Sequence, residues 1–144
     1  MMYGKFALSS IVAGVLAMAS QVALAQVAVV VSAKSPVGNL TDEQVASVYL
    51  GKTNTLPGGG AVALADLPES NPARDHFYTK ATGKNGAQIK ATWARLTFSG
   101  KGVPPKELAT SADVKKFVAG NPNAIGYIEK SAVDASVKVV LSLD

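Results

Sequence analysis

Three polar side chains gather in a short turn just before a segment with helical spacing. Ser70 and Asn71 offer a hydroxyl and an amide, and Arg74 follows within one helical turn. Hydroxyl, amide and bidentate guanidinium groups are donors that hold an oxyanion at the amino end of a helix. The alternative is structural: Asn71 only caps the helix, and Arg74 pairs with a surface carboxylate such as Asp75 or Glu69. Both interpretations stay open at this level.

Little else in the sequence indicates catalysis or a cofactor. His76 is the single histidine and cysteine is absent, which excludes multi-histidine and thiolate metal sites. The glycines at 58–60 precede an apolar run and no Lys-Ser/Thr pair, so they predict a turn and not a nucleotide loop. His76 stands beside Phe77 and Tyr78, where we expect it to pack. We therefore expect no catalytic residue, no metal and no cofactor, and a protein that is not an enzyme.

Residues 1–25 have the pattern of a cleaved secretory signal peptide. A basic start and an apolar run precede the small residues that end at Ala25. The apolar run is short for a membrane span of about 20 residues. We expect one domain at 26–144, located in the periplasm, with no membrane span after signal cleavage.

The charge of the chain narrows the class of partner. The net charge is +4, the lysines are scattered, and few aromatic residues alternate with them. Nucleic acid is therefore not expected to bind. A mildly positive field still favours anionic solutes.

Strands and helices alternate along the expected domain. Apolar and β-branched runs predict strands at 26–33, 61–67, 124–128 and 137–141. Helical spacing predicts helices that begin near residues 41, 72, 87 and 111. Thr41 with Gln44 has the pattern of a capping box, and Ser111 is expected to cap the last helix. This order predicts an α/β fold, a sheet covered by helices.

Three stretches resemble the phosphate ABC transporter substrate-binding family: LTDEQVASVYLGK at 40–52, RLTFSGKGVPP at 95–105 and NPNAIGYI at 121–128. The resemblance runs from about Val29 to the C-terminus. It implies a single periplasmic-binding-protein-like lobe, with a mixed sheet flanked by helices. It also implies that the ligand is phosphate or a similar oxyanion, bound for an ABC transporter.

The turn before the second helix departs from the family pattern. In the relatives, an arginine is followed by Gly-Ser-Gly-Thr, and the anion rests on free amides at the helix start. Here Leu67 or a neighbour stands where the relatives place a guanidinium, and Pro72 has no N–H to offer. Glu69 and Asp75 would repel an anion. The resemblance thus implies a weakened or altered oxyanion site made of the three donors named above.

Two functions follow from these observations. The first is an exported periplasmic solute-binding protein of the phosphate-binding type, which serves an inner-membrane transporter or an envelope sensor. One lobe alone leaves the anion half hydrated, so a homodimer or a partner would have to close the site. The second is a single-lobe interaction module that has lost solute binding and docks on an envelope sensor, porin or transporter. An exposed apolar patch would favour the second.

Overall fold

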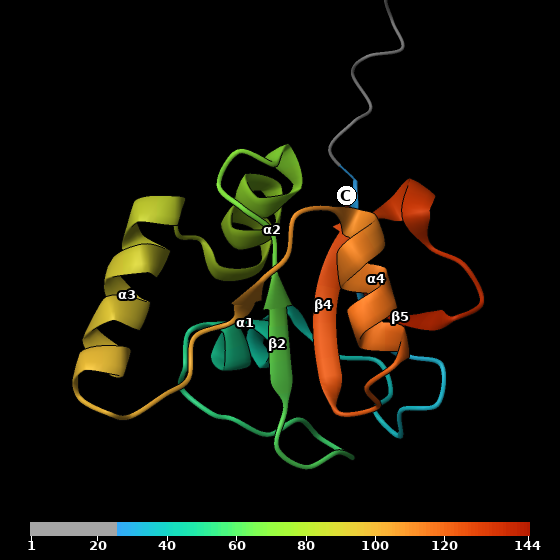
Figure 1. Ribbon diagram of the computed structural model, residues 1–144, viewed down its shortest axis with the longest axis horizontal. Helices are drawn as coiled ribbons and strands as arrows, with labels where there is room; N and C mark the ends of the chain where they lie inside the picture. Colours follow the sequence, from blue (N-terminus) through green and yellow to red (C-terminus); the bar gives the residue numbers. More distant parts are fainter. Residues whose placement is uncertain (1–25) are drawn as a thin grey trace, which may run out of the picture.

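A mixed five-stranded sheet with helices on both faces forms the protein (Figure 1). The computed structural model describes residues 26–144, so the predicted signal peptide lies outside the described residues. In chain order the elements are β1 (Val27–Ser32), α1 (Asp42–Tyr49), β2 (Ala63–Asp66), α2 (Pro72–Thr82), α3 (Gly86–Phe98), β3 (Lys106–Glu107), α4 (Ser111–Ala119), β4 (Ala124–Glu129), a short 3₁₀ helix η2 (Lys130–Ala132) and β5 (Val137–Leu143).

The first strand of the described chain lies inside the sheet. The strand order is β3-β2-β4-β1-β5, so β1 has a neighbour on each side. It runs antiparallel to both, with Val27 opposite Glu129 of β4 and Leu143 of β5. β2 runs parallel to β3 and β4. All six residues of β1 are buried, as its apolar sequence predicts for a strand covered on both faces.

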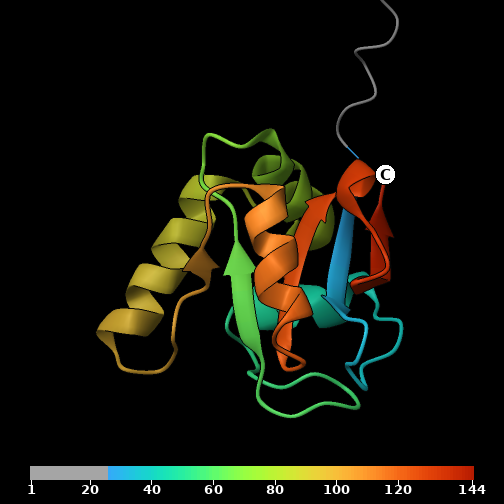
Figure 2. The same ribbon diagram turned by 45° about the vertical axis from the view of Figure 1, so that its right-hand side comes forward.

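Different helices cover the two faces of the sheet. A Cβ added to Gly126 of β4 would lie 2.6 Å from the side chain of Val114, which belongs to α4. The next residue, Tyr127, points to the opposite face, because successive side chains of a strand alternate. There its ring stacks on Phe77 of α2 at 4.0 Å and meets Tyr49 of α1 edge-on. Figure 2 shows α4 in front of the sheet and α1 behind it.

Each of the four α-helices of the described chain begins at a residue whose side chain caps it, and the caps of α1 and α4 test the sequence predictions. Thr41 Oγ1 accepts a hydrogen bond from Gln44 N at 3.1 Å, and Gln44 Oε1 accepts one from Thr41 N at 2.9 Å. The predicted capping box is therefore present. The predicted cap of α4 is wrong: Ser111 is the first helical residue, and Thr110 before it supplies the capping oxygen. Thr110 has the extended backbone that a cap requires, and Ser111 does not.

The α/β fold expected from the sequence is confirmed. All four predicted strands and all four predicted helices are present. The strand β3 was not predicted, because its two exposed residues, Lys106 and Glu107, are too few to show a pattern. Among residues 26–144, no helix has both the length and the apolar character needed to cross a membrane.

Candidate functional site

A buried carboxylate ends strand β2. Asp66 is only 4% exposed. Its Oδ1 accepts hydrogen bonds from Leu67 N at 2.8 Å and from the hydroxyl of Tyr127. Its Oδ2 accepts a hydrogen bond from the hydroxyl of Tyr78 at 2.6 Å and lies 3.0 Å from Arg74 Nη1. Both carboxylate oxygens therefore have partners, as a buried ionisable group requires.

Three elements, β2, α2 and β4, supply four residues that we call the carboxylate cluster. The cluster consists of Asp66, Arg74, Tyr78 and Tyr127. Arg74 and Tyr78 are four residues apart on α2, so they share one face of the helix. The guanidinium carbon of Arg74 lies 5.2 Å from the centroid of the Tyr78 ring. Tyr127 reaches the same point from β4. The cluster thus joins α2 to the centre of the sheet.

Burial shifts the acid–base behaviour of the cluster. Loss of hydration raises the pKa of Asp66 above its ordinary value, and the hydrogen bonds from Tyr127 and Tyr78 and the charge of Arg74 offset only part of that rise. Burial also raises the pKa of Tyr78 and of Tyr127, and the nearby charge of Asp66 raises both further. The two phenols therefore stay protonated and serve as hydrogen-bond donors.

Asn71 and Ser70 take no part in this cluster. Asn71 is the N-cap of α2, and its Oδ1 accepts a hydrogen bond from Ala73 N at 2.9 Å. The Asn71 N–H donates to the carbonyl of Pro68 at 2.9 Å, and Pro72 carries no N–H. Ser70 is exposed. The capping role of Asn71 is confirmed, and ligand binding by Ser70 and Asn71 stays a prediction.

Arg74 points into the protein and not across the helix end. It is 9% exposed, and its Nη1 also donates to the carbonyl of Leu67 at 2.9 Å. The structural alternative, in which Arg74 pairs with Asp75 or Glu69, is wrong about the partner, which is Asp66. A buried carboxylate needs a compensating charge far more than an exposed one does. Arg74 Nε is buried as well and has no hydrogen-bond partner within the described structure.

A hollow of about 420 Å³ opens beside Arg74. We call it the Arg74 hollow; it lies between α2, the turn before α2 and the start of α3. Two cationic side chains line it, together with two acidic ones that oppose their charge. The lining residues are Glu69, Arg74, Asp75, Tyr78, Gly86, Ala87 and Lys90.

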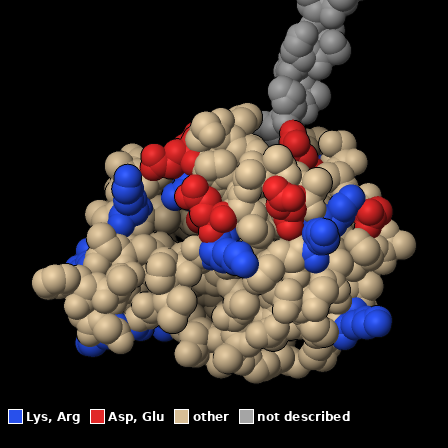
Figure 3. All heavy atoms as spheres, in the orientation of Figure 1, with Lys and Arg blue, Asp and Glu red and all other residues tan. Residues whose placement is uncertain are grey.

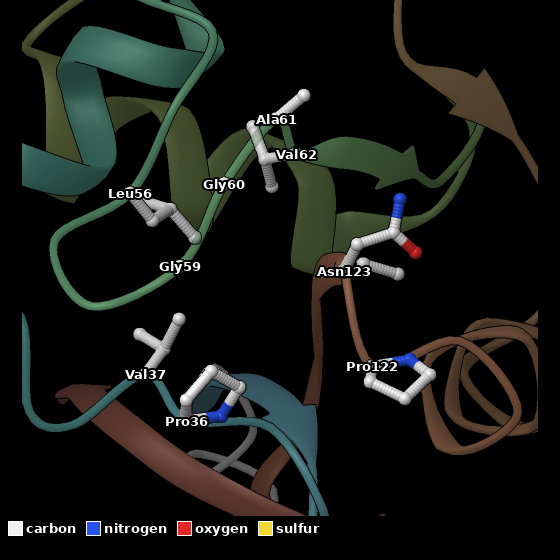
Figure 4. A pocket seen from close by; sticks show the side chains of 10 residues that line it. Pro36, Val37, Leu56, Gly59, Gly60, Ala61, Val62, Pro122 and Asn123 are labelled. Carbon is white, nitrogen blue, oxygen red and sulfur yellow. The ribbon is translucent and has the colours of Figure 1, made fainter.

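A second hollow, of about 210 Å³, is lined almost entirely by apolar side chains (Figure 4). Pro36 and Val37 face Leu56 across it, and Asn123 is the polar residue at its edge. No charged residue lines this hollow, so it offers an anion little attraction.

The single histidine of the chain has a structural role. His76 is partly buried, and its Nε2 lies 3.1 Å from the carbonyl oxygen of Leu143. This is the packing role that the sequence predicts for it. Within residues 26–144, no group of three His, Asp or Glu side chains is placed to hold a metal ion.

The carboxylate cluster was not predicted from the sequence, apart from Arg74. The one available signal was Asp66, a carboxylate inside the apolar run at 61–67 that predicts a strand. An ionisable residue at such a position must find partners inside the fold. Nothing in the sequence indicated that those partners are Tyr78 and Tyr127, because one of them lies 61 residues away.

No protein-family model matches the chain. Among solved structures, it is similar to one described as a phosphate ABC transporter substrate-binding protein with bound phosphate from Clostridium perfringens. The identity is 28% and the TM-score 0.65, over 81% of this chain and 45% of the other. For an ABC-type phosphate transport receptor from Vibrio cholerae, the identity is 24% and the TM-score 0.62, over 81% of this chain and 46% of the receptor.

A third structure, PstS from Borrelia burgdorferi, shows the same fold at 13% identity and a TM-score of 0.59, over 81% of this chain and 47% of PstS. The chain thus spans less than half the length of these three proteins. That share is the one expected for a single lobe. The resemblance seen in the sequence is confirmed: the chain has the fold of one part of the phosphate ABC transporter substrate-binding proteins.

Proposed function

We propose that the protein is an exported solute-binding protein of the phosphate-binding type, and that it binds phosphate or a similar oxyanion in the periplasm. The observation that carries this proposal is the buried Nε of Arg74, which has no partner, in a residue that lines a hollow. A buried donor without an acceptor costs free energy, and an anion oxygen would remove that cost. The C. perfringens protein, to which the chain is similar, was solved with bound phosphate.

The Arg74 hollow suits a small anion in size and in part in charge. Its volume, about 420 Å³, falls within the range of small-molecule sites. Lys90 of α3 supplies a second positive charge. Glu69 and Asp75 oppose an anion, and Asp66 already neutralises much of the charge of Arg74. We therefore expect weak binding, strengthened when a second copy, a transporter or a sensor covers the open side.

Calorimetric titration of the purified protein with phosphate tests this function, with sulfate as the comparison anion. Arg74→Lys keeps a positive charge near Asp66 but removes the Nε donor and the planar fork. Loss of one charge-assisted hydrogen bond costs about 1.5–3 kcal/mol, so the Kd should rise at least about tenfold. Lys80→Gln is the matched control, because Lys80 is exposed on the same helix and does not line the hollow.

Two results would count against oxyanion binding at this site. One is the absence of any heat of binding at millimolar phosphate for the wild-type protein. The other is equal affinity in the wild type and in Arg74→Lys. Circular dichroism of each variant separates a loss of binding from a loss of folding.

The second candidate function is an interaction module. Its support is the exposure of two large apolar side chains near the end of α3: Phe98 is 95% exposed and Val103 is 85% exposed. Neither lines the Arg74 hollow. Exposed apolar patches are typical of surfaces that contact another protein, and these two residues stand five positions apart in the chain.

A further inference from the structure

A third hollow shares no lining residue with the Arg74 hollow. Its volume is about 760 Å³, and it lies between β2, α3 and the loop that joins α3 to β3. Figure 1 shows α3 standing at the edge of the molecule, with this loop running back from its end to β3. We call this hollow the lysine groove; it is lined by Val48, Gly51, Lys52, Thr53, Asn54, Ala61, Val62, Ala63, Leu64, Trp93, Gly100, Lys101, Gly102, Val103, Pro104, Lys106 and Phe117.

The charge of the groove has a single sign. Lys52, Lys101 and Lys106 line it, and no aspartate or glutamate does. All three lysines are exposed, and none forms an ion pair with the described residues. On the face drawn in Figure 3 the acidic side chains lie in the upper half, whereas basic side chains also lie below them. A partner for this groove should therefore be acidic.

The groove also has apolar lining residues, among them Trp93 and Val103. Trp93 is 8% exposed, and its Nε1 donates to the carbonyl of Tyr49 at 2.9 Å, which holds the indole ring in place. A Cβ added to Gly102 would lie 3.1 Å from the Trp93 ring, so the loop packs directly on it. Val103 lines the groove, and Phe98 lies just before the loop. An occupant needs apolar side chains as well as negative charge.

Part of one edge of β2 is open beside the groove. β3 pairs only with Ala65 and Asp66, whereas Ala63 and Leu64 pair with β4 on the other side. Both of these residues line the groove. The open edge is short, so most of the contact with an extended segment must come from side chains. It nevertheless favours a chain that runs in line with β3 over a compact ligand.

We infer that the lysine groove docks an acidic, extended segment of another protein, with glutamates or aspartates on the lysines and apolar residues on Trp93 and Val103. A small anion could meet the lysines, but it would leave Val103 bare. This inference develops the second candidate function. It does not depend on anion binding in the Arg74 hollow.

Trp93 makes the docking measurable, since it is the only tryptophan of the chain and lines the groove. The probe is a peptide of about ten residues, ~30 Å when extended, with glutamate alternating with leucine or valine. We expect it to change the Trp93 emission in a saturable way. The same peptide with lysine in place of glutamate should bind far more weakly, because its charges meet like charges.

Amino-acid substitutions test whether the acidic peptide binds in the lysine groove. Lys101→Gln/Lys106→Gln should raise the Kd of the acidic peptide about tenfold, because each exposed charge pair contributes up to about 1 kcal/mol to binding. The matched control is Lys34→Gln/Lys80→Gln, which removes the same charge from exposed residues outside the groove. This control should bind nearly as the wild type does. Val103→Ser should weaken the peptide several-fold with no loss of folding, because Val103 lines the groove and is 85% exposed.

Four outcomes would overturn the inference. They are no change of Trp93 emission up to about 1 mM peptide, equal losses in the two double variants, equal binding of the basic peptide, and full displacement by phosphate with no effect of Val103→Ser. The last would assign the groove to a small anion. Trp93 does not line the Arg74 hollow, so failure here leaves the calorimetric test of phosphate binding intact.

Discussion

Replacing Arg74 with methionine should destabilise the protein strongly. The change removes the charge 3.0 Å from Asp66 and the hydrogen bond to the carbonyl of Leu67, and it leaves a buried carboxylate without its cation. Breaking a buried ion pair on one side costs about 3–5 kcal/mol. The free energy of unfolding of an ordinary domain is about 5–15 kcal/mol, so this loss is a large part of it. Asp66→Asn/Arg74→Met should cost less, because a neutral amide needs no cation and its carbonyl still accepts a hydrogen bond from a tyrosine hydroxyl.

The stability deficit of Arg74→Met is its loss in free energy of unfolding relative to the wild type, and the pH dependence of this deficit is a sharper test. The folded-state pKa of Asp66 is raised above 3.8, so the folded protein keeps a proton that the unfolded chain releases. The contribution of Asp66 to stability therefore falls as the pH rises from the unfolded to the folded pKa. The charge of Arg74 lowers the Asp66 pKa, so Arg74→Met raises the folded-state pKa further. The pH range over which stability falls then becomes wider. The deficit of Arg74→Met should grow with pH.

Urea unfolding of the wild type, the single variants and the double variant, followed by Trp93 fluorescence at about pH 4.5 and about pH 8, measures both effects. The double-mutant cycle isolates the coupling between Asp66 and Arg74. A deficit below about 1 kcal/mol for Arg74→Met, or one that does not change with pH, would refute the reasoning.

Three further predictions concern stability and use the same urea assay. Gly126→Ala should cost about 1–3 kcal/mol, because the new methyl meets an α4 side chain at 2.6 Å, whereas Gly60→Ala has open space and should be nearly neutral; equal costs would contradict this. Asn71→Ala should cost about 1 kcal/mol, because it removes the cap of α2, whereas Ser70→Ala should cost almost nothing. A larger loss of stability in Ser70→Ala than in Asn71→Ala would contradict this. Tyr49→Phe removes a buried hydroxyl that donates to the Ala65 carbonyl at 2.7 Å and should cost about 1–3 kcal/mol, and a neutral result would show that the carbonyl finds another donor.

Features that depend on neighbours in sequence could be predicted. The bonds between Thr41 and Gln44 join residues three apart, so the pattern of types is enough to foresee them. Gly100 has φ of 71°, as expected for a glycine just after a helix end. The interior strand β1 could be predicted from its unbroken apolar run. The fold class followed from the order of such elements.

Features that depend on contacts between distant residues could not be predicted. Arg74 has carboxylates next to it at Asp75 and nearby at Glu69, yet it pairs with Asp66, which the fold buries. The two tyrosines that share this carboxylate come from different elements, and no local pattern links them. The lysine groove was equally hidden, because its lysines are scattered along the chain. Binding by Ser70, Asn71 and Arg74 is still a prediction.

The place of β1 inside the sheet has a consequence for how the chain acquires its structure. Val27 pairs with residues far later in the chain, Glu129 in β4 and Leu143 in β5. β1 therefore cannot find its place in the sheet until both of these strands have been made, and contacts between such distant residues make folding slow. The sequence of β1 is also strongly apolar, so this strand stays exposed to aggregation or to a chaperone until its partners arrive. Such a delay suits a polypeptide that is predicted to be threaded through a membrane before it folds.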